Sequence, residues 1–428
     1  MNFIRRLFLK LFRRKNKEHI TDVSENLEFS KTREINITPG REMEKPAVVP
    51  QAEERLADHC PYCNSKDFVK RGTRKKKFEV VQLYLCRICG KTFTAQLVKG
   101  KRYPLHAIIE ALNYYHIGYP FESSCKIIKQ KFGFDVKAST LSGWVEEFSE
   151  FCSYGRMRPY AIKHFAPKDT IEVVTMAHRQ LYQFRYHRAK MKLSLDEEYR
   201  NRSLRPLKEY LDSVSSETPH QYFEDGVRAS EIKERFSTDK LYIRGKQNYA
   251  TKTAAFVLQA VKENTARHDA LQRFFIANDS VTVATEVPVY ITGDDIVHMR
   301  DRLGFDIPEC KEIGSRHRLI ITGHIDFLQV RNGRVHILDF KPRADREKPI
   351  EQLTWYALAL SRLTGLRMYE FMCAWFDEDN YYEFFPLHAV YKKTQKKRKQ
   401  WNKSLKVGEV FMPDEMRPKH KIVAQIKV

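Results

Sequence analysis

Two aspartates and a lysine have the types and the spacing of a metal-dependent hydrolytic site. They lie in the stretch IITGHIDFLQVRNGRVHILDFKP, where two alternating apolar runs meet at Asn332-Gly333. That dipeptide favours a two-residue hairpin, and counting outward without a bulge places Asp326 opposite Asp339, with Cβ atoms about 5 Å apart. Lys341, two residues beyond Asp339, faces the same side. Facing carboxylates repel unless a cation or a proton lies between them, and Mg²⁺ or Mn²⁺ suits such oxygen ligands.

The elements around these residues follow a recognisable order. A helix, three strands, a helix and a strand are predicted over residues 248–376. Within them, Gly323-His-Ile-Asp326 followed by Asp339-Phe-Lys341 resembles the signature of the PD-(D/E)xK nuclease superfamily, closest to its RecB-type branch. The resemblance implies a restriction-endonuclease-like αβββαβ core that hydrolyses phosphodiester bonds in DNA. It makes Asp326 and Asp339 ligands of Mg²⁺ or Mn²⁺, and Lys341 the group that orients water or stabilises charge at the phosphate.

Four further residues enter through the same resemblance. Gln352 and Tyr356, in EQLTWYALAL, match the helix that follows the catalytic lysine in the RecB-type branch. His268 matches an upstream histidine ligand, although its place on an apolar helix face is equally typical of a core histidine. Glu286, in VTVATEVPVYI, either adds a carboxylate to the metal site or occupies a solvated position on its strand.

A non-catalytic protein is the alternative function. The chain would then be a DNA-binding regulator or a transposition accessory protein that keeps the nuclease fold as a scaffold, with the Asp-Asp-Lys hairpin a solvated face. The intact Asp326, Asp339 and Lys341 favour a nuclease. The sequence contains no G-x-x-x-x-G-K-[ST] loop, so duplex unwinding would need a helicase or similar partner. The mode of cleavage, the preferred DNA and the oligomeric state stay open.

Two Cys-x-x-Cys pairs predict a structural zinc ribbon over residues 59–97. Cys60-Pro-Tyr-Cys63 and Cys86-Arg-Ile-Cys89 are 22 residues apart, and four thiolates at such spacing close a tetrahedral Zn²⁺ site with no open position. The other four cysteines are scattered, which is typical of a reducing, cytoplasmic compartment and disfavours disulfides. The intervening basic residues suit phosphate contacts, with a solvated loop as the alternative: Lys70, Arg71, Arg74, Lys75, Lys76 and Lys77.

Three short helices are predicted over residues 103–150. Apolar periodicity gives helices at 104–117, 121–132 and about 139–148, with Gly118 and Gly133 ending the first two. The order resembles a helix-turn-helix with the third helix as the reader, and a plain three-helix bundle is the alternative. Together with the zinc ribbon, it resembles the N-terminal DNA-binding region of insertion-sequence transposases.

Composition sets the remaining expectations. Among 428 residues, Lys and Arg exceed Asp and Glu by 22, which implies a polyanionic partner, and DNA is the expected one. We expect no transmembrane segment, because the apolar stretch at the start is short and broken by charges. We predict a multidomain α+β protein. Its remaining parts are a basic N-terminus and disordered linker (1–58), a helical connector (151–247), the nuclease domain (248–390) and a basic tail (391–428).

Overall fold

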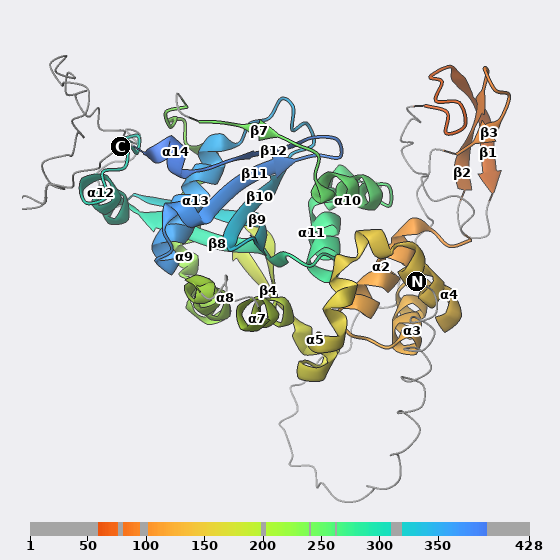
Figure 1. Cartoon of the computed structure of the whole chain (residues 1–428), viewed down its shortest axis with the longest axis horizontal. Coiled ribbons are helices and arrows are strands. Elements are labelled where there is room, and N and C mark those ends of the chain that lie inside the picture. The colour runs from red at the N-terminus through yellow and green to blue at the C-terminus, as the bar shows by residue number, and fades with distance from the viewer. Residues whose placement is uncertain are drawn as a thin grey trace, which may run out of the picture. The chain divides into compact units, whose positions relative to one another are not determined.

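The computed structural model describes most of the chain between its two ends (Figure 1). The described residues are 59–75, 80–94, 102–197, 203–238, 241–261, 263–309 and 319–391. The chain divides into two units, 1–51 and 52–428, and all described residues belong to the second. The predicted N-terminal linker, the basic tail from 392, Lys76 and Lys77 lie outside the described residues. Within the described ranges, no helix has the length and apolar character needed to cross a membrane.

The elements form an α+β protein with two sheets. The strands are β1 Phe68–Lys75, β2 Val80–Cys86, β3 Thr92–Phe93, β4 Ile171–His178, β5 Gln180–His187, β6 Val227–Arg228, β7 Arg244–Gly245, β8 Thr282–Thr292, β9 Ile320–Arg331, β10 Arg334–Phe340, β11 Phe371–Phe376 and β12 Tyr381–Phe384. The helices are α2 Leu105–His116, α3 Phe121–Phe132, α4 Ala138–Glu147, α5 Arg158–His164, α6 Pro167–Thr170, α7 Arg188–Glu197, α8 Arg205–Glu217, α9 His220–Asp225, α10 Tyr249–Leu258, α11 Arg267–Asn278, α12 Gly293–Asp301, α13 Ile350–Thr364 and α14 Leu387–Val390.

The large sheet is mixed and has the order β4-β5-β8-β9-β10-β11-β12-β7, with β6 paired to β9 outside this path. Strands β8, β9 and β10 are antiparallel neighbours, whereas β11 lies parallel to β10. Helix α13 connects β10 to β11 and lies across these strands (Figure 1). The predicted order of a helix, three strands, a helix and a strand is therefore found in α11, β8, β9, β10, α13 and β11, with α12 added between β8 and β9.

The β9–β10 hairpin has the predicted turn and register. Asn332 and Gly333 have φ of +53° and +70°, the positive pair that a type I′ turn requires. The strands pair without a shift from Arg331 with Arg334 to Leu338 with Phe327. The turn therefore determines which residues of the two strands face each other, including those that carry charge.

The prediction of a helical connector at 151–247 is wrong at residues 171–187 and at the short strands β6 and β7. Residues 171–187 form the antiparallel strands β4 and β5, and β5 pairs with β8 at the margin of the core strands. Buried side chains along these strands, including Met176, Phe184 and Tyr186, join the main hydrophobic cluster. The residues themselves favour strands here, because β-branched residues fill much of β4 and aromatic residues alternate along β5, and pairing with β8 buries part of the hairpin. Helices α7, α8 and α9 follow the hairpin as expected.

The three-helix segment has the predicted boundaries within two residues. Gly118 and Gly133 follow α2 and α3 with φ of +124° and +71°, a region that glycine adopts without steric cost. Its apolar side chains do not form a separate core. Ile108 and Leu112 of α2 share one hydrophobic cluster with α10, α11 and strand residues such as Phe327. The segment and the large sheet therefore pack as one body.

A buried polar network also joins α2 to α11. Asn278, at the end of α11, donates from Nδ2 to Asn113 Oδ1 at 2.5 Å, and its Oδ1 lies 2.8 Å from His116 Nδ1. All three side chains are buried. Burial lowers the pKa of His116 to about 4, so the ring is neutral at pH 7. A buried network of this kind is stable only while each member keeps its partners.

We predict that Asn278→Ala lowers the free energy of unfolding by about 2–3 kcal/mol, because it removes the buried hydrogen bonds with Asn113 Oδ1 and His116 Nδ1. Urea unfolding followed by circular dichroism measures the change. Asn264→Ala, at an exposed asparagine of the same domain, is the matched control and should shift stability by less than about 0.5 kcal/mol. Equal effects of the two substitutions would contradict the role of the network.

Candidate active site and metal centre

Three carboxylates lie in one row across the adjacent strands β8, β9 and β10. The β8–β9 pairing keeps the same register on both sides of Glu286, which places Glu286 opposite Asp326. The β9–β10 register, followed one step beyond its last pair, places Asp339 opposite Asp326. Neighbouring strands are about 4.8 Å apart, so each carboxylate interacts electrostatically with the next one. The predicted pair thus belongs to a set of three.

Burial and mutual repulsion distribute charge unevenly over the row. Burial, followed by the neighbouring Asp326, raises the pKa of Asp339 to about 7, and the same two causes raise that of Glu286 to about 7. Burial acts against the charged form of Asp326 too, but its hydrogen bond with His268 and the charge of Lys341 lower its pKa below the usual value. The central carboxylate is therefore the one most firmly ionised.

Two basic side chains contact the row. Lys341 Nζ lies 2.8 Å from Asp339 Oδ2, an atom that is buried and accepts no hydrogen bond of normal geometry. His268 Nδ1 lies 3.3 Å from Asp326 Oδ2, which also accepts the backbone N–H of Phe340 at 3.2 Å. The His268 side chain is 41% exposed, so the alternative of a core histidine does not describe it. A buried oxygen without a regular donor is a site that a cation can satisfy.

The backbone at Glu286 is strained. Its φ of +51° is a left-handed conformation that costs a non-glycine residue about 1–3 kcal/mol. Gln272 Nε2, from α11, donates to Glu286 Oε1 at 2.6 Å and so holds the carboxylate at this position. Glu286 is thus a held and largely buried residue rather than a solvated one. Strain of this kind concentrates at functional sites.

Gln352 and Tyr356 of α13 lie beside the row. Gln352 Nε2 donates to the Tyr356 hydroxyl at 2.8 Å. The Tyr356 ring rests against the backbone of Gly323, where an added Cβ would stand 2.1 Å from the ring atom Cε1. Glycine is required at 323 because the tyrosine occupies the space of any side chain. The motif glycine and the motif tyrosine therefore form one packing unit.

These residues line a cavity of about 800 Å³. All seven residues predicted for the nuclease site belong to its lining: His268, Glu286, Asp326, Asp339, Lys341, Gln352 and Tyr356. Much of the remaining wall comes from the β4–β5 hairpin and from residues near α9 and β6, to which sequence reasoning assigns no role. The alternation of LYQFRYH along β5 is a strand signal that could have revealed this wall.

A chain of three histidines belongs to this second wall. His178 Nδ1 lies 2.9 Å from His324 Nε2, and His178 Nε2 lies 2.8 Å from His220 Nδ1. Tyr182 stacks on His324 with ring centroids 3.6 Å apart, and Phe223 stacks on His178 at 4.0 Å. Burial lowers the pKa of His178 to about 4. His178 is therefore neutral at pH 7, and the stacked rings connect the hairpin to β9.

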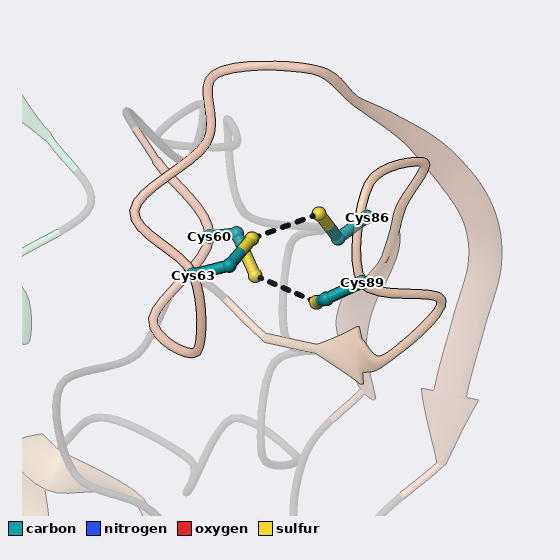
Figure 2. Close-up of side chains that lie close together, drawn as sticks. All are labelled: Cys60, Cys63, Cys86 and Cys89. Carbon is teal, nitrogen blue, oxygen red and sulfur yellow. Dashed lines mark hydrogen bonds between the residues drawn. The ribbon is translucent and has the colours of Figure 1, made fainter.

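The four cysteines form the second site (Figure 2). Sγ atoms of Cys60 and Cys89 are 3.6 Å apart, and those of Cys63 and Cys86 are 3.5 Å apart. Thiolates about 2.3 Å from a tetrahedral zinc lie about 3.8 Å from one another, so the geometry fits. All four cysteines are free, which excludes disulfides within the set. The ligand atoms of the four cysteines all lie within 4.8 Å of one another. Among clusters of at least three His, Cys, Asp or Glu side chains, these cysteines are the set found at such distances within the described residues.

Each cysteine pair sits on the same kind of turn. The N–H of Asn64 donates to Cys60 O at 2.9 Å, and the N–H of Gly90 donates to Cys86 O at 3.0 Å. Asn64 and Gly90 have φ of +59° and +68°. Asparagine and glycine tolerate this left-handed conformation better than other residues. The repeated turn directs both thiols of each pair toward the other pair, as Figure 2 shows.

The basic residues predicted to contact phosphate lie on β1. Lys70, Arg71, Arg74 and Lys75 are exposed there. The strand pairs with β2, and the small sheet has the order β1-β2-β3 around Tyr84 and Phe93. The zinc-binding turns and the basic strand thus belong to one small unit.

We predict that the chain binds one zinc ion through the four cysteines, and that Cys63→Ser abolishes stoichiometric zinc. Thiolate ligation contributes folding free energy, so chelation should unfold this unit while the large sheet keeps its circular dichroism. Metal analysis of purified protein measures the stoichiometry. Cys125→Ser, outside the cluster, is the control. A wild-type protein without zinc, purified without chelator, would refute the prediction.

Comparisons with protein-family models, with curated proteins and with solved structures give no match to this chain. No family is assigned on that basis. The function is therefore argued from the two sites described above, namely the four-cysteine cluster and the row of carboxylates in its cavity.

Proposed function

We propose that this protein is a metal-dependent nuclease of the PD-(D/E)xK type that hydrolyses phosphodiester bonds in DNA. The observation that supports it most is the row of Glu286, Asp326 and Asp339 with Lys341 at 2.8 Å, inside a cavity of about 800 Å³. A solvated hairpin would have no reason to bury Asp339, which is 2% exposed. The strand and helix order around the row also agrees with a restriction-endonuclease-like core.

Asp326 and Asp339 would hold Mg²⁺ or Mn²⁺, with Glu286 and His268 as neighbouring ligands or supports. When bound, the ion would polarise the phosphate and lower the pKa of water. Lys341 stands beside Asp339, where its ammonium can orient the attacking water and offset charge that develops on the phosphate. Tyr356 and Gln352 would complete the wall against which the substrate is positioned.

The N-terminal modules would bring the site to DNA. We assign the four-cysteine unit as a zinc ribbon with structural Zn²⁺, and α3–α4 as a helix-turn-helix. Lys126 and Lys129 of α3 are exposed and suit phosphate contacts, while the early residues of α4, including Ser139 and Ser142, offer small polar side chains to base edges. The excess of 22 basic residues agrees with a nucleic-acid partner.

We predict that Asp339→Ala reduces Mg²⁺- or Mn²⁺-dependent DNA cleavage at least about 100-fold, because several kcal/mol of electrostatic stabilisation are removed. DNA binding should stay equal or become slightly tighter, since one negative charge leaves the phosphate path. Cleavage and fluorescence anisotropy are measured on single-stranded, duplex and branched DNA, with metal and with chelator. Asp301→Ala, at an exposed aspartate of α12 outside the cavity, is the matched control.

Two outcomes would contradict the proposal in different ways. Equal cleavage by the wild type and by Asp339→Ala would place the activity elsewhere or in a contaminant. DNA binding without cleavage of any DNA or RNA substrate would favour the alternative of a non-catalytic DNA-binding regulator or transposition accessory protein.

We also predict that DNA affinity depends on β1. Replacing Arg71, Arg74 and Lys75 by alanine should reduce the slope of log K against log salt by about 0.7–0.9 for each phosphate that these side chains neutralise. Titrations at several salt concentrations measure the slope. The control replaces three exposed basic residues of the large domain, Arg302, Lys348 and Arg367. An unchanged slope in the β1 variant would exclude the strand from the DNA interface.

A further inference from the structure

Arg228 differs from the other arginine and lysine side chains that line the cavity. Each of the others has a carboxylate partner: Arg185 with Asp269 at 2.5 Å, Arg273 with Glu110 at 2.6 Å and Lys341 with Asp339 at 2.8 Å. Within the part of the chain that the structure describes, the guanidinium of Arg228 forms no hydrogen bond or ion pair. An unpaired arginine at the wall of an acidic cavity has its donors available for an anion.

The backbone fixes Arg228 at this wall. It belongs to the two-residue strand β6, which pairs with β9 so that Arg228 lies beside Thr322. Gly226, just before β6, packs so closely that an added Cβ would stand 2.5 Å from Tyr222 O. Arg179, at the tip of the β4–β5 hairpin, donates to Glu224 O and Gly226 O at 2.7 and 2.8 Å. Three separate segments thus hold the strand that presents Arg228.

An aromatic ring lines the same cavity as this guanidinium. Tyr182 also lines the cavity, and one face of its ring stacks on His324 with an interplanar angle of 7°. His324 lies on β9 two residues beyond Thr322, the residue that pairs with Arg228. The Tyr182 side chain remains partly exposed. Arg228 and Tyr182 therefore place an anion binder and a flat apolar surface in the lining of one cavity.

We propose that Arg228 and Tyr182 form a subsite for an unpaired nucleotide of the substrate strand, in which the guanidinium binds a backbone phosphate and the phenol ring stacks on the adjacent base. The subsite rests on the proposed nuclease function. Thr322 precedes Asp326 by four residues, about 13 Å along β9, so the bound phosphate is one or two nucleotides from the scissile one. A base inside a duplex is already stacked on its neighbours, so the subsite selects a strand with a free base.

The test pairs the protein variant with a matching change in the substrate. Single-stranded oligonucleotides carry one uncharged methylphosphonate at successive linkages, and cleavage by the full chain is measured with Mg²⁺. For the wild-type protein, a methylphosphonate at one particular linkage near the scissile phosphate should raise KM about 10- to 100-fold with little change in kcat. The reason is that the Arg228 guanidinium no longer contacts a charged phosphate at that linkage. The Arg228→Ala variant should already have this raised KM with the unmodified substrate. A methylphosphonate at that linkage should not raise its KM further.

Two comparisons separate a direct role in binding from a structural one. Arg244→Ala removes an exposed charge from β7, another two-residue strand, outside the cavity lining, and should keep the wild-type response. Tyr182→Phe should keep KM because it retains the ring, whereas Tyr182→Leu should raise KM roughly 10-fold because leucine cannot stack on a base. The same oligonucleotides are also bound to the Asp339→Ala chain, so that Kd reports the subsite even if cleavage fails.

The outcomes distinguish this subsite from the nuclease proposal. Absence of cleavage by wild type refutes the nuclease, and the Kd series then decides the subsite. The methylphosphonates change KM and Kd by certain factors in each variant. If these factors are the same in Arg228→Ala and in Arg244→Ala at every linkage, the subsite does not exist. Equal affinity for blunt duplex and single strand, unchanged by Tyr182→Leu, would also overturn it.

Discussion

The row of Glu286, Asp326 and Asp339 is the constraint on which the rest of the large domain depends. Three carboxylates at the spacing of adjacent strands repel one another strongly when they are buried, and two of them have pKa values raised to about 7. Side chains from two elements contact the carboxylates and offset this repulsion. Lys341 follows β10, and His268 and Gln272 belong to α11. Under the proposed function, a bound divalent cation would neutralise the remaining charge of the row.

Helix α11 links this row to the N-terminal half of the protein. It carries His268 and Gln272 near its start and Asn278 at its end, where the polar network with α2 is formed. The three-helix segment therefore rests on the same helix that supports the carboxylates. Under the proposed function, DNA would be held by the helical segment whose apolar side chains share a cluster with α11.

The sequence predicts the parts of the structure that local rules determine. Asn332-Gly333 requires a tight turn, so the opposition of Asp326 and Asp339 follows by counting, and Cys-x-x-Cys spacing predicts the thiol cluster. Other features depend on contacts between distant segments. The helical prediction for the β4–β5 hairpin missed the alternating aromatic residues of β5, and the pairing of this hairpin with β8 depends on a distant segment. The place of Glu286 opposite Asp326 likewise depends on the register of β8 against β9.

The most direct test of the account is where a divalent cation binds. Crystals of the full chain soaked in Mn²⁺ would be measured at a wavelength at which manganese scatters anomalously. The account predicts an anomalous peak within coordination distance of carboxylate oxygens from both Asp326 and Asp339, and its loss in Asp339→Ala. A peak elsewhere in the protein, with neither aspartate as a ligand, would contradict it.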